Sequence, residues 1–385
     1  MKLDEKVQFY KTGQSRSRAG GRTGNAFYLK YTVLVMSALF LLVDVGAANN
    51  LERTAKISNV QPRRDINGDI IDAHDGCLEF FNGTYFLYGT RYGRTDGFGK
   101  SNRYVCYSSP DLETWIPRGE ILKDAPPRVY YRPYVKFNKS TRKYVLWCNA
   151  DNHYTVAVSD TPAGPFIVQN SNVRVKNGDT QGDFGLFLDD DGTGYITYSF
   201  SPASVDWSAK TEPIKHHQIC VEKLTPDYLG STMESTEPIA GNVESPAMFK
   251  RNGVYYLLFD NTCCFGVYGS GARVYTASGP MGPFVYRGNI NIKAASARNL
   301  SSPFTEPGTG RPDCIIKAQQ TDVATLPTSN GLVYIWMGDR WGSRPDGIKG
   351  HDFQYWSHPL EFYPDGMIKQ LNWDETFAVG IVGPG

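Results

Sequence analysis

Residues 242–260, NVESPAMFKRNGVYYLLFD, decide the fold of this chain. A short apolar segment ends in the turn Arg-Asn-Gly, and a tyrosine-rich run follows the turn. Asparagine and glycine tolerate tight backbone conformations, and aromatic residues favour strands. The stretch therefore predicts two short strands joined by a turn, with one acidic residue, Glu244, just before them.

The same turn and tyrosine-rich strand recur from about residue 60 onward. The pattern occurs five times, at 82–90, 140–149, 191–199, 252–260 and 330–339. A second strand that ends in another turn follows each of them, at 103–115, 154–166, 218–227, 272–284 and 353–362. No long segment shows a clear helical period.

Repeats of several short strands, roughly 50 to 80 residues apart, are the signature of a β-propeller. Each unit is a small sheet that cannot bury its faces alone, whereas radial packing buries them and leaves only short, protected edges. We therefore predict an all-β, five-bladed β-propeller over residues 60–380. A β-sandwich is the alternative. In a propeller, residues on or just before the inner strands converge on one pocket.

Residues 1–50 form a basic N-terminal leader. Lysines and arginines precede an apolar run at about 32–43, and small residues follow at 45–48. The run is shorter than the roughly 20 residues that span a bilayer, so a signal peptide is predicted. The alternative is an uncleaved signal anchor, which would make the chain a single-pass type II membrane protein. Both interpretations place the remaining chain outside the cell or in the lumen of the secretory pathway.

Composition excludes some partners. The 40 basic and 39 acidic residues nearly balance, so no nucleic acid partner is expected. Seven cysteines include no Cys-x-x-Cys pair, so there is no zinc signature, and no metal or cofactor is predicted. Disulfide pairing stays open. Sequons at Asn82, Asn138 and Asn299 agree with a secreted glycoprotein.

Three acidic residues hold equivalent places in the repeats. Asp75, Asp183 and Glu244 each precede a short apolar segment, a turn and a tyrosine-rich strand. An inverting glycosidase needs one protonated acid on the leaving oxygen and one carboxylate that activates water on the opposite face of the sugar. A neighbouring carboxylate can hold the acid protonated by raising its pKa. The pattern therefore favours glycoside hydrolysis.

Three motifs resemble the signature regions of glycoside hydrolase family 43. They are HDG at 74–76, DFGLFLDDDGTGY at 183–195 and VESPAMFKRNGVYYLLF at 243–259. The resemblance runs from about residue 65 to 375 and implies a five-bladed propeller that hydrolyses glycosidic bonds with inversion. By position, it implies that Glu244 is the general acid, that Asp183 orients this acid and tunes its pKa, and that Asp75 is the general base.

Further segments resemble the exo-β-1,3-galactanase branch of that family, among them AQQTDV at 318–323 and MGDRWGS at 337–343. That branch lacks the aspartate that this chain has as Asp75 and uses a glutamine that matches Gln319, so Gln319 is the alternative base. The resemblance implies an oligosaccharide or polysaccharide substrate, most closely a β-1,3-galactan. The alternatives are an α-L-arabinofuranosidase or β-xylosidase of the same family, or a carbohydrate-binding propeller without catalysis.

Four further residues are predicted to bind the substrate, namely His74, Tyr131, Tyr154 and Arg311. His217 lies in a polar loop and is interpreted as solvated. The corner Asp339-Arg340-Trp341 is interpreted as structural, with the arginine paired to a carboxylate.

Overall fold

The computed structural model describes residues 53–122, 124–178, 180–201, 217–261, 265–293 and 313–382. Within these ranges the chain is almost entirely β-structure, with one short 3-10 helix at Lys349–His351. The strands form five blade sheets and one two-stranded sheet. Blade 1 contains β2 (Leu78–Phe81), β3 (Thr84–Arg91), β4 (Arg103–Ser109) and β5 (Ile116–Glu120). Blade 2 contains β6 (Tyr130–Asn138), β7 (Lys143–Ala150), β8 (His153–Ser159) and β9 (Ile167–Val173). Blade 3 contains β10 (Thr180–Leu188), β11 (Gly194–Ser201), β12 (Gln218–Leu224) and β13 (Ser231–Ser235). Blade 4 contains β14 (Val243–Arg251), β15 (Val254–Asn261), β16 (Arg273–Ala277) and β17 (Val285–Asn289). Blade 5 contains β18 (Gln319–Thr328), β19 (Gly331–Arg340) and β20 (Phe353–Trp356).

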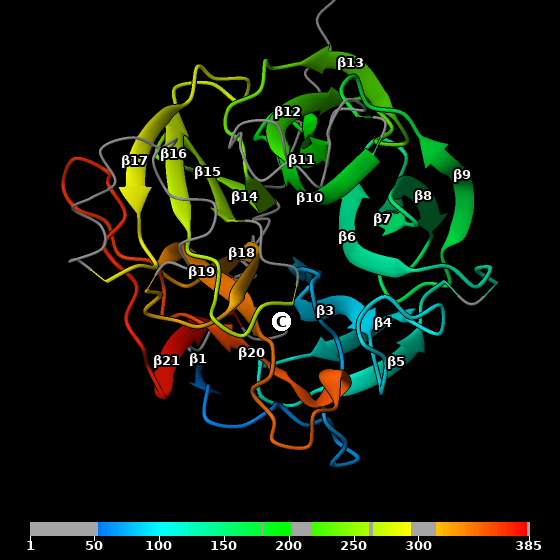
Figure 1. The fold of residues 1–385 in the computed structure, drawn as a ribbon, viewed down its shortest axis with the longest axis vertical. Coiled ribbons are helices and arrows are strands. Elements are labelled where there is room, and N and C mark those ends of the chain that lie inside the picture. Colours follow the sequence, from blue (N-terminus) through cyan, green and yellow to red (C-terminus); the bar gives the residue numbers. More distant parts are fainter. Residues whose placement is uncertain are drawn as a thin grey trace, which may run out of the picture. The chain divides into compact units, whose positions relative to one another are not determined.

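The blades stand around a common centre, and each is an antiparallel meander that runs outward from its first strand (Figure 1). Contacts between neighbouring blades follow the ring: β3 contacts β6, β6 contacts β10, β10 contacts β14, β14 contacts β18, and β18 contacts β2. The prediction of a five-bladed β-propeller is therefore confirmed, and the sandwich alternative is wrong. The tyrosine-rich runs form the second strand of each blade, where their side chains are largely buried.

The two ends of the propeller pair with each other. Strand β1 (Arg53–Ser58) runs antiparallel to β21 (Thr376–Ile381). Ala55 and Ile57 pack with apolar residues of blades 1 and 5 in one buried cluster. Asn59 also exchanges two hydrogen bonds with the backbone of Trp356, at 2.8 and 3.1 Å. The sheet of the chain ends thereby joins the last blade to the first.

An irregularity recurs near the start of the inner strands. The ladders of β6, β10, β14 and β18 with their neighbours each shift register there, as expected for β-bulges. A bulge bends the strand and redirects its side chains. Asp75, Arg132 and Ser245 have positive φ angles of 52°, 56° and 56°, which are uncommon for residues other than glycine. These local distortions turn polar side chains toward the axis.

Several predictions fall outside the described residues: the leader at 1–50, Arg311, the sequon at Asn299 and the pair Cys263–Cys264. Cleavage of the leader and the cellular location stay predictions. Within the described ranges, no helix has the length and apolar character needed to cross a membrane. The described cysteines are all buried, namely Cys77, Cys106, Cys148, Cys220 and Cys314, and the first four are free thiols.

The described sequons differ in accessibility. Asn82 lies exposed in the hairpin turn between β2 and β3. The side chain of Asn138, in contrast, is buried and donates a hydrogen bond to the carbonyl of Pro226 at 2.8 Å. Glycosylation of Asn138 would require this contact to break, and glycosylation of the chain stays a prediction.

The joint between the chain ends can be tested with neighbouring residues of β1. We expect Ile57→Ala to lower the free energy of unfolding by about 2–4 kcal/mol, because it leaves a cavity in the cluster between blades 1 and 5. Lys56→Ala, on the exposed face of the same strand, should change stability by no more than about 0.5 kcal/mol. Urea unfolding followed by tryptophan fluorescence measures both. Equal effects would contradict the role of β1 in closing the ring.

Candidate active site

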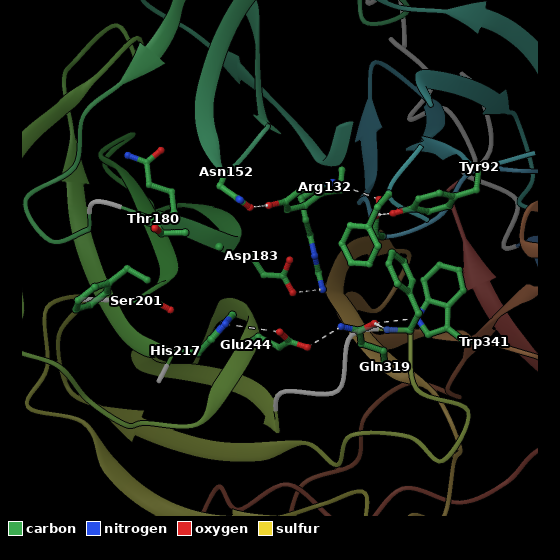
Figure 2. A pocket seen from close by; sticks show the side chains of 17 residues that line it. Tyr92, Arg132, Asn152, Thr180, Asp183, Ser201, His217, Glu244, Gln319 and Trp341 are labelled. Atoms are coloured by element: carbon green, nitrogen blue, oxygen red, sulfur yellow. Dashed lines mark hydrogen bonds and ion pairs between the residues drawn. The ribbon is translucent and has the colours of Figure 1, made fainter. Parts of the chain in front are cut away.

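A cavity of about 220 Å³ lies where the inner strands converge (Figure 2). It is lined by residues of all five blades and of the loops between them: Asp75, Tyr92, Phe98, Tyr131, Arg132, Asn152, Thr180, Gln181, Gly182, Asp183, Phe200, Ser201, His217, Glu244, Phe265, Gln319 and Trp341. The cavity thus brings together all four residues predicted to be catalytic, which lie up to 244 positions apart in the sequence.

Each blade supplies one polar side chain at the start of its inner strand. Asp75 precedes β2, Arg132 is on β6, Asp183 on β10, Glu244 on β14 and Gln319 on β18. The bulges described above lie at or beside the last four of these residues. The distorted inner strands therefore build the cavity floor from short segments that share one place in the fold.

Arg132 is the cation of the site. Its guanidinium is 2% exposed and bonds to Asp183 Oδ2 at 2.9 Å and to the carbonyls of Thr321 and Gln320 at 3.0 and 3.1 Å. It also donates to Ser245 Oγ, which itself donates to Asp183 Oδ2 at 2.9 Å. Burial lowers the pKa of Arg132, but the Asp183 carboxylate and other nearby acids outweigh burial and raise it. The guanidinium stays charged and holds Asp183 in place.

Asp75 is held on both carboxylate oxygens. Tyr92 donates its hydroxyl to Oδ2, and the backbone N–H of Arg132 donates to Oδ1 at 3.3 Å. The backbone N–H of Asp75 itself donates to Asp339 Oδ2 at 2.7 Å. Burial raises the pKa of Asp75 to about 7, and the Asp339 carboxylate adds to this, although Arg132 and Tyr92 oppose it. A carboxyl with this pKa can accept a proton near neutral pH.

His74 supports this arrangement from behind the cavity. Its side chain is 1% exposed, does not line the cavity and contacts Asp339 Oδ1 through Nδ1 at 3.0 Å. Burial lowers the pKa of His74, but the Asp339 and Asp72 carboxylates raise it to about 9. Its ring packs against Tyr92 and Trp341. His74 therefore lies outside the cavity lining and neutralises Asp339, and its role in substrate binding stays a prediction.

Glu244 contacts Gln319 with one carboxyl oxygen and lies near His217 with the other. Gln319 Nε2 donates to Glu244 Oε1 at 2.9 Å, and His217 Nδ1 lies 3.8 Å from Oε2. Figure 2 shows this row running from His217 through Glu244 and Gln319 to Trp341. Glu244 is 3% exposed, yet it lines the cavity, so its carboxyl is shielded from bulk water but accessible to a bound ligand.

Of the other residues predicted to bind the substrate, Tyr131 lines the cavity and Tyr154 does not. Tyr131 lines the cavity, and its hydroxyl donates to Asn152 Oδ1. Tyr154 does not line the cavity: it is fully buried, and its hydroxyl donates to the carbonyl of Gly182 at 3.1 Å. Tyr154 therefore supports β10 from within the core, and its role in substrate binding stays a prediction. Arg311 lies outside the described residues.

The lining residues that the sequence interpretation missed include Tyr92, Arg132, His217 and Trp341. His217 was expected to be solvated, but it stands beside Glu244. The corner at 339–341 differs from the prediction, because among the described residues Arg340 forms no salt bridge and lies over the rings of Trp373 and Phe353, at 4.6 and 4.7 Å. Asp339 instead accepts from the segment around Asp75, as described above.

The cavity has two unlike walls. One is aromatic, formed by Tyr92, Phe98, Phe265 and Trp341, whose rings contact one another with centroids 5.0–5.6 Å apart. The other is polar and presents Asn152, Thr180, Ser201 and His217 (Figure 2). A sugar ring matches both, since it has an apolar face and a rim of hydroxyl groups. The volume is below the roughly 300–1,000 Å³ of drug-sized pockets, which suits a single sugar residue. In the described part of the chain, no cluster of three or more His, Cys, Asp or Glu residues is arranged to hold a metal.

The raised pKa of Asp75 predicts how the free energy of unfolding depends on pH. Its pKa is about 7 in the folded chain but about 3.9 in an unfolded one. Between these values the unfolded chain releases a proton that the folded chain keeps, so this group lowers the unfolding free energy by up to about 1.4 kcal/mol per pH unit. Asp75→Asn removes this titration. We expect its stability relative to the unmodified chain to rise from pH 4.5 to 7 in urea unfolding. A difference independent of pH would contradict the buried, proton-binding state.

Comparison with known proteins bears on this site. Residues 74–310 match the model of Glycosyl hydrolases family 43. A β-D-galactofuranosidase of Aspergillus niger is 29% identical over 271 residues, which cover 61% of this chain and 70% of that protein. An arabinoxylan arabinofuranohydrolase of Paenibacillus polymyxa is 24% identical over 332 residues, 74% of this chain but only 47% of the relative. The chain thus spans less than half the length of the second protein.

Solved structures share the fold. An exo-β-1,3-galactanase from Clostridium thermocellum superposes with a TM-score of 0.65 at 23% identity and covers 85% of this chain and 68% of its own. A variant of the exo-β-1,3-galactanase from Phanerochaete chrysosporium, bound to β-1,3-galactotriose, has a TM-score of 0.65 at 22% identity, with coverage of 85% and 69%. At these identities the likeness establishes the common propeller and no more.

Proposed function

Because this chain belongs to family 43 of the glycosyl hydrolases, we propose that it is an inverting, exo-acting hydrolase of terminal β-1,3-linked galactose residues. That the protein is a glycoside hydrolase follows from the family, which favours a hydrolase over a propeller that only binds carbohydrate. The observation that carries the mechanism is the convergence of Asp75, Asp183 and Glu244 on one small cavity. The galactan preference rests on the sequence motifs and is compatible with the galactanases that share the fold.

In the proposed reaction, Glu244 gives its proton to the glycosidic oxygen while the bond from that oxygen to the anomeric carbon breaks. A water molecule on the opposite face attacks the anomeric carbon and gives a proton to Asp75. The products are the shortened glycan, with a new hydroxyl group, and a free sugar of inverted configuration. Solvent then returns the proton from Asp75 to Glu244. Asp183, fixed by Arg132, supplies a negative charge that favours the protonated form of Glu244.

The size of the cavity supports exo action. A pocket that accommodates one sugar residue and is closed by the five inner strands admits the end of a glycan but not its middle. The aromatic wall can stack on the apolar face of that residue, and the polar wall can bond to its hydroxyl groups. Because the β-D-galactofuranosidase of Aspergillus niger is the most similar in sequence of the relatives described above, release of a terminal furanose is the second candidate.

The substrate can be identified with a panel of aryl glycosides. It comprises the β-galactopyranoside, β-galactofuranoside, α-L-arabinofuranoside and β-xyloside, together with β-1,3-galactobiose and β-1,3-galactotriose. We expect hydrolysis of the β-galactopyranosyl compounds, with galactose as the only sugar released early from the triose. Proton NMR of the first product should show the inverted anomer. A retained anomer would contradict the mechanism, and preferential cleavage of a furanoside would favour the second candidate.

The proton donor can be tested by Glu244→Gln, which keeps the size of the side chain but removes the acidic proton. We expect turnover of β-1,3-galactobiose to fall by about two to four orders of magnitude, the usual contribution of a general acid. Asp191→Asn, in the exposed turn between β10 and β11, is the matched control and should retain activity. Circular dichroism and thermal unfolding verify that both variants fold. Full activity of Glu244→Gln would refute the assignment.

A further inference from the structure

We propose that Gln319 is a positioning residue that fixes the acidic proton of Glu244 on one carboxyl oxygen, and that it does not serve as the catalytic base. The base is then Asp75, although the galactanase-like motifs of the sequence favour Gln319 equally. This inference rests on the proposed function and concerns how the same site works.

Two neighbours determine the orientation of the Gln319 side chain. The indole Nε1–H of Trp341 donates to Gln319 Oε1 at 2.8 Å, and the backbone N–H of Phe265 donates to the same oxygen at 3.4 Å. An indole N–H can only donate, so it must face the oxygen of the amide and not its NH₂ group. The Gln319 NH₂ group is therefore directed to Glu244, at 2.9 Å from Oε1.

This orientation constrains the proton on Glu244. An amide NH₂ group can only donate, so Glu244 Oε1 must accept from it and cannot itself carry the proton on that side. When Glu244 is protonated as the general acid, the proton belongs on Oε2, the oxygen nearer to His217. Trp341, Gln319 and Glu244 thus form a chain of hydrogen bonds that selects one of two carboxyl oxygens as the donor.

The same contacts exclude Gln319 as a base. The nitrogen of an amide has no available lone pair, and a tautomer with a basic nitrogen needs a proton on the oxygen. At Gln319 that oxygen already faces two donors, Trp341 and Phe265. Its two lone pairs are used, so it has no acceptor capacity left for a catalytic water. In addition, a direct contact between Gln319 and Glu244 is far shorter than the roughly 6.5–9.5 Å that separate acid and base in inverting enzymes.

A second glutamine shows that this clamp is a repeated device of blade 5. Gln320 Oε1 accepts from Trp336 Nε1 at 2.8 Å, and Gln320 Nε2 donates to the carbonyl of Ser245 at 2.7 Å. Both glutamines therefore use an indole on or directly after β19 to orient their NH₂ groups toward consecutive residues of blade 4. They differ in the acceptor, which is a carboxyl group for Gln319 and a peptide carbonyl for Gln320.

The test uses the dependence of rate on the leaving group. Full-length Gln319→Ala, Asp75→Ala and Trp341→Phe variants are assayed on aryl β-galactosides of different phenol acidity and on β-1,3-galactobiose. A poorly placed acid matters most for a poor leaving group. We therefore expect Gln319→Ala to lower kcat by about 10- to 100-fold on galactobiose, but by less than threefold (~0.7 kcal/mol) on the dinitrophenyl galactoside. Trp341→Phe should give a smaller loss with the same dependence.

Loss of the base has another signature. Asp75→Ala should lose activity on all leaving groups alike, and azide should restore cleavage of the dinitrophenyl galactoside by attacking the anomeric carbon in place of water, which yields a galactosyl azide. Gln320→Ala is the matched control for packing, and any loss should be uniform across leaving groups. A uniform loss for Gln319→Ala with rescue by azide would overturn the proposal, as would a loss for Trp341→Phe that is uniform across leaving groups. An unmodified enzyme that hydrolyses the furanosides instead would overturn the galactan preference alone, and the same series would then be run on that sugar.

Discussion

A single arginine connects all five blades of this propeller. Arg132 belongs to blade 2, and its guanidinium bonds to Asp183 of blade 3, Ser245 of blade 4 and two carbonyls of blade 5. Its backbone N–H donates to Asp75, at the entrance of blade 1. A buried guanidinium is costly unless its donors are satisfied. Because the acceptors of the guanidinium come from three different blades, the charge is stable only when these segments occupy their native positions, and the same positions define the cavity.

The way in which each charge is compensated explains why several buried acidic residues can lie close together in this site. Asp183 is compensated directly by Arg132. Asp339 is compensated by His74, whose pKa of about 9 keeps it charged at neutral pH. Asp75 has neither a full ion pair nor free access to water, so its pKa rises to about 7. The difference in compensation gives one carboxyl, that of Asp75, the affinity for protons that a base requires, while Asp183 and Asp339 are held in ion pairs.

Much of the fold and part of the site could be read from the sequence, for identifiable reasons. The tyrosine-rich strands repeat because each blade buries the same face, so the five blades and the places of Asp75, Asp183 and Glu244 were predictable. Arg132 was not, because the bulge that turns it inward leaves no compositional signal. The burial of Tyr154 in the core was not predictable either, because an aromatic near an inner strand has the same pattern whether it faces the axis or the core. His217 approaches Glu244 from a loop, where periodicity carries no information.

The order of the blades around the ring also accounts for the separate roles of the acids. Glu244 and Gln319 hold matching positions in neighbouring blades: each lies at the start of its inner strand, just before the bulge, and pairs with an aspartate of the next strand. Equivalent positions in adjacent blades are close together, as their direct hydrogen bond demonstrates. Blade 1, in contrast, does not adjoin blade 4 in the ring, since blade 5 stands between them. A water and a sugar ring must fit between acid and base, so the partner of Glu244 has to come from a blade that is not its neighbour. Asp75 meets that requirement, and Asp183, on the adjacent blade 3, is placed to act on Glu244 by its charge.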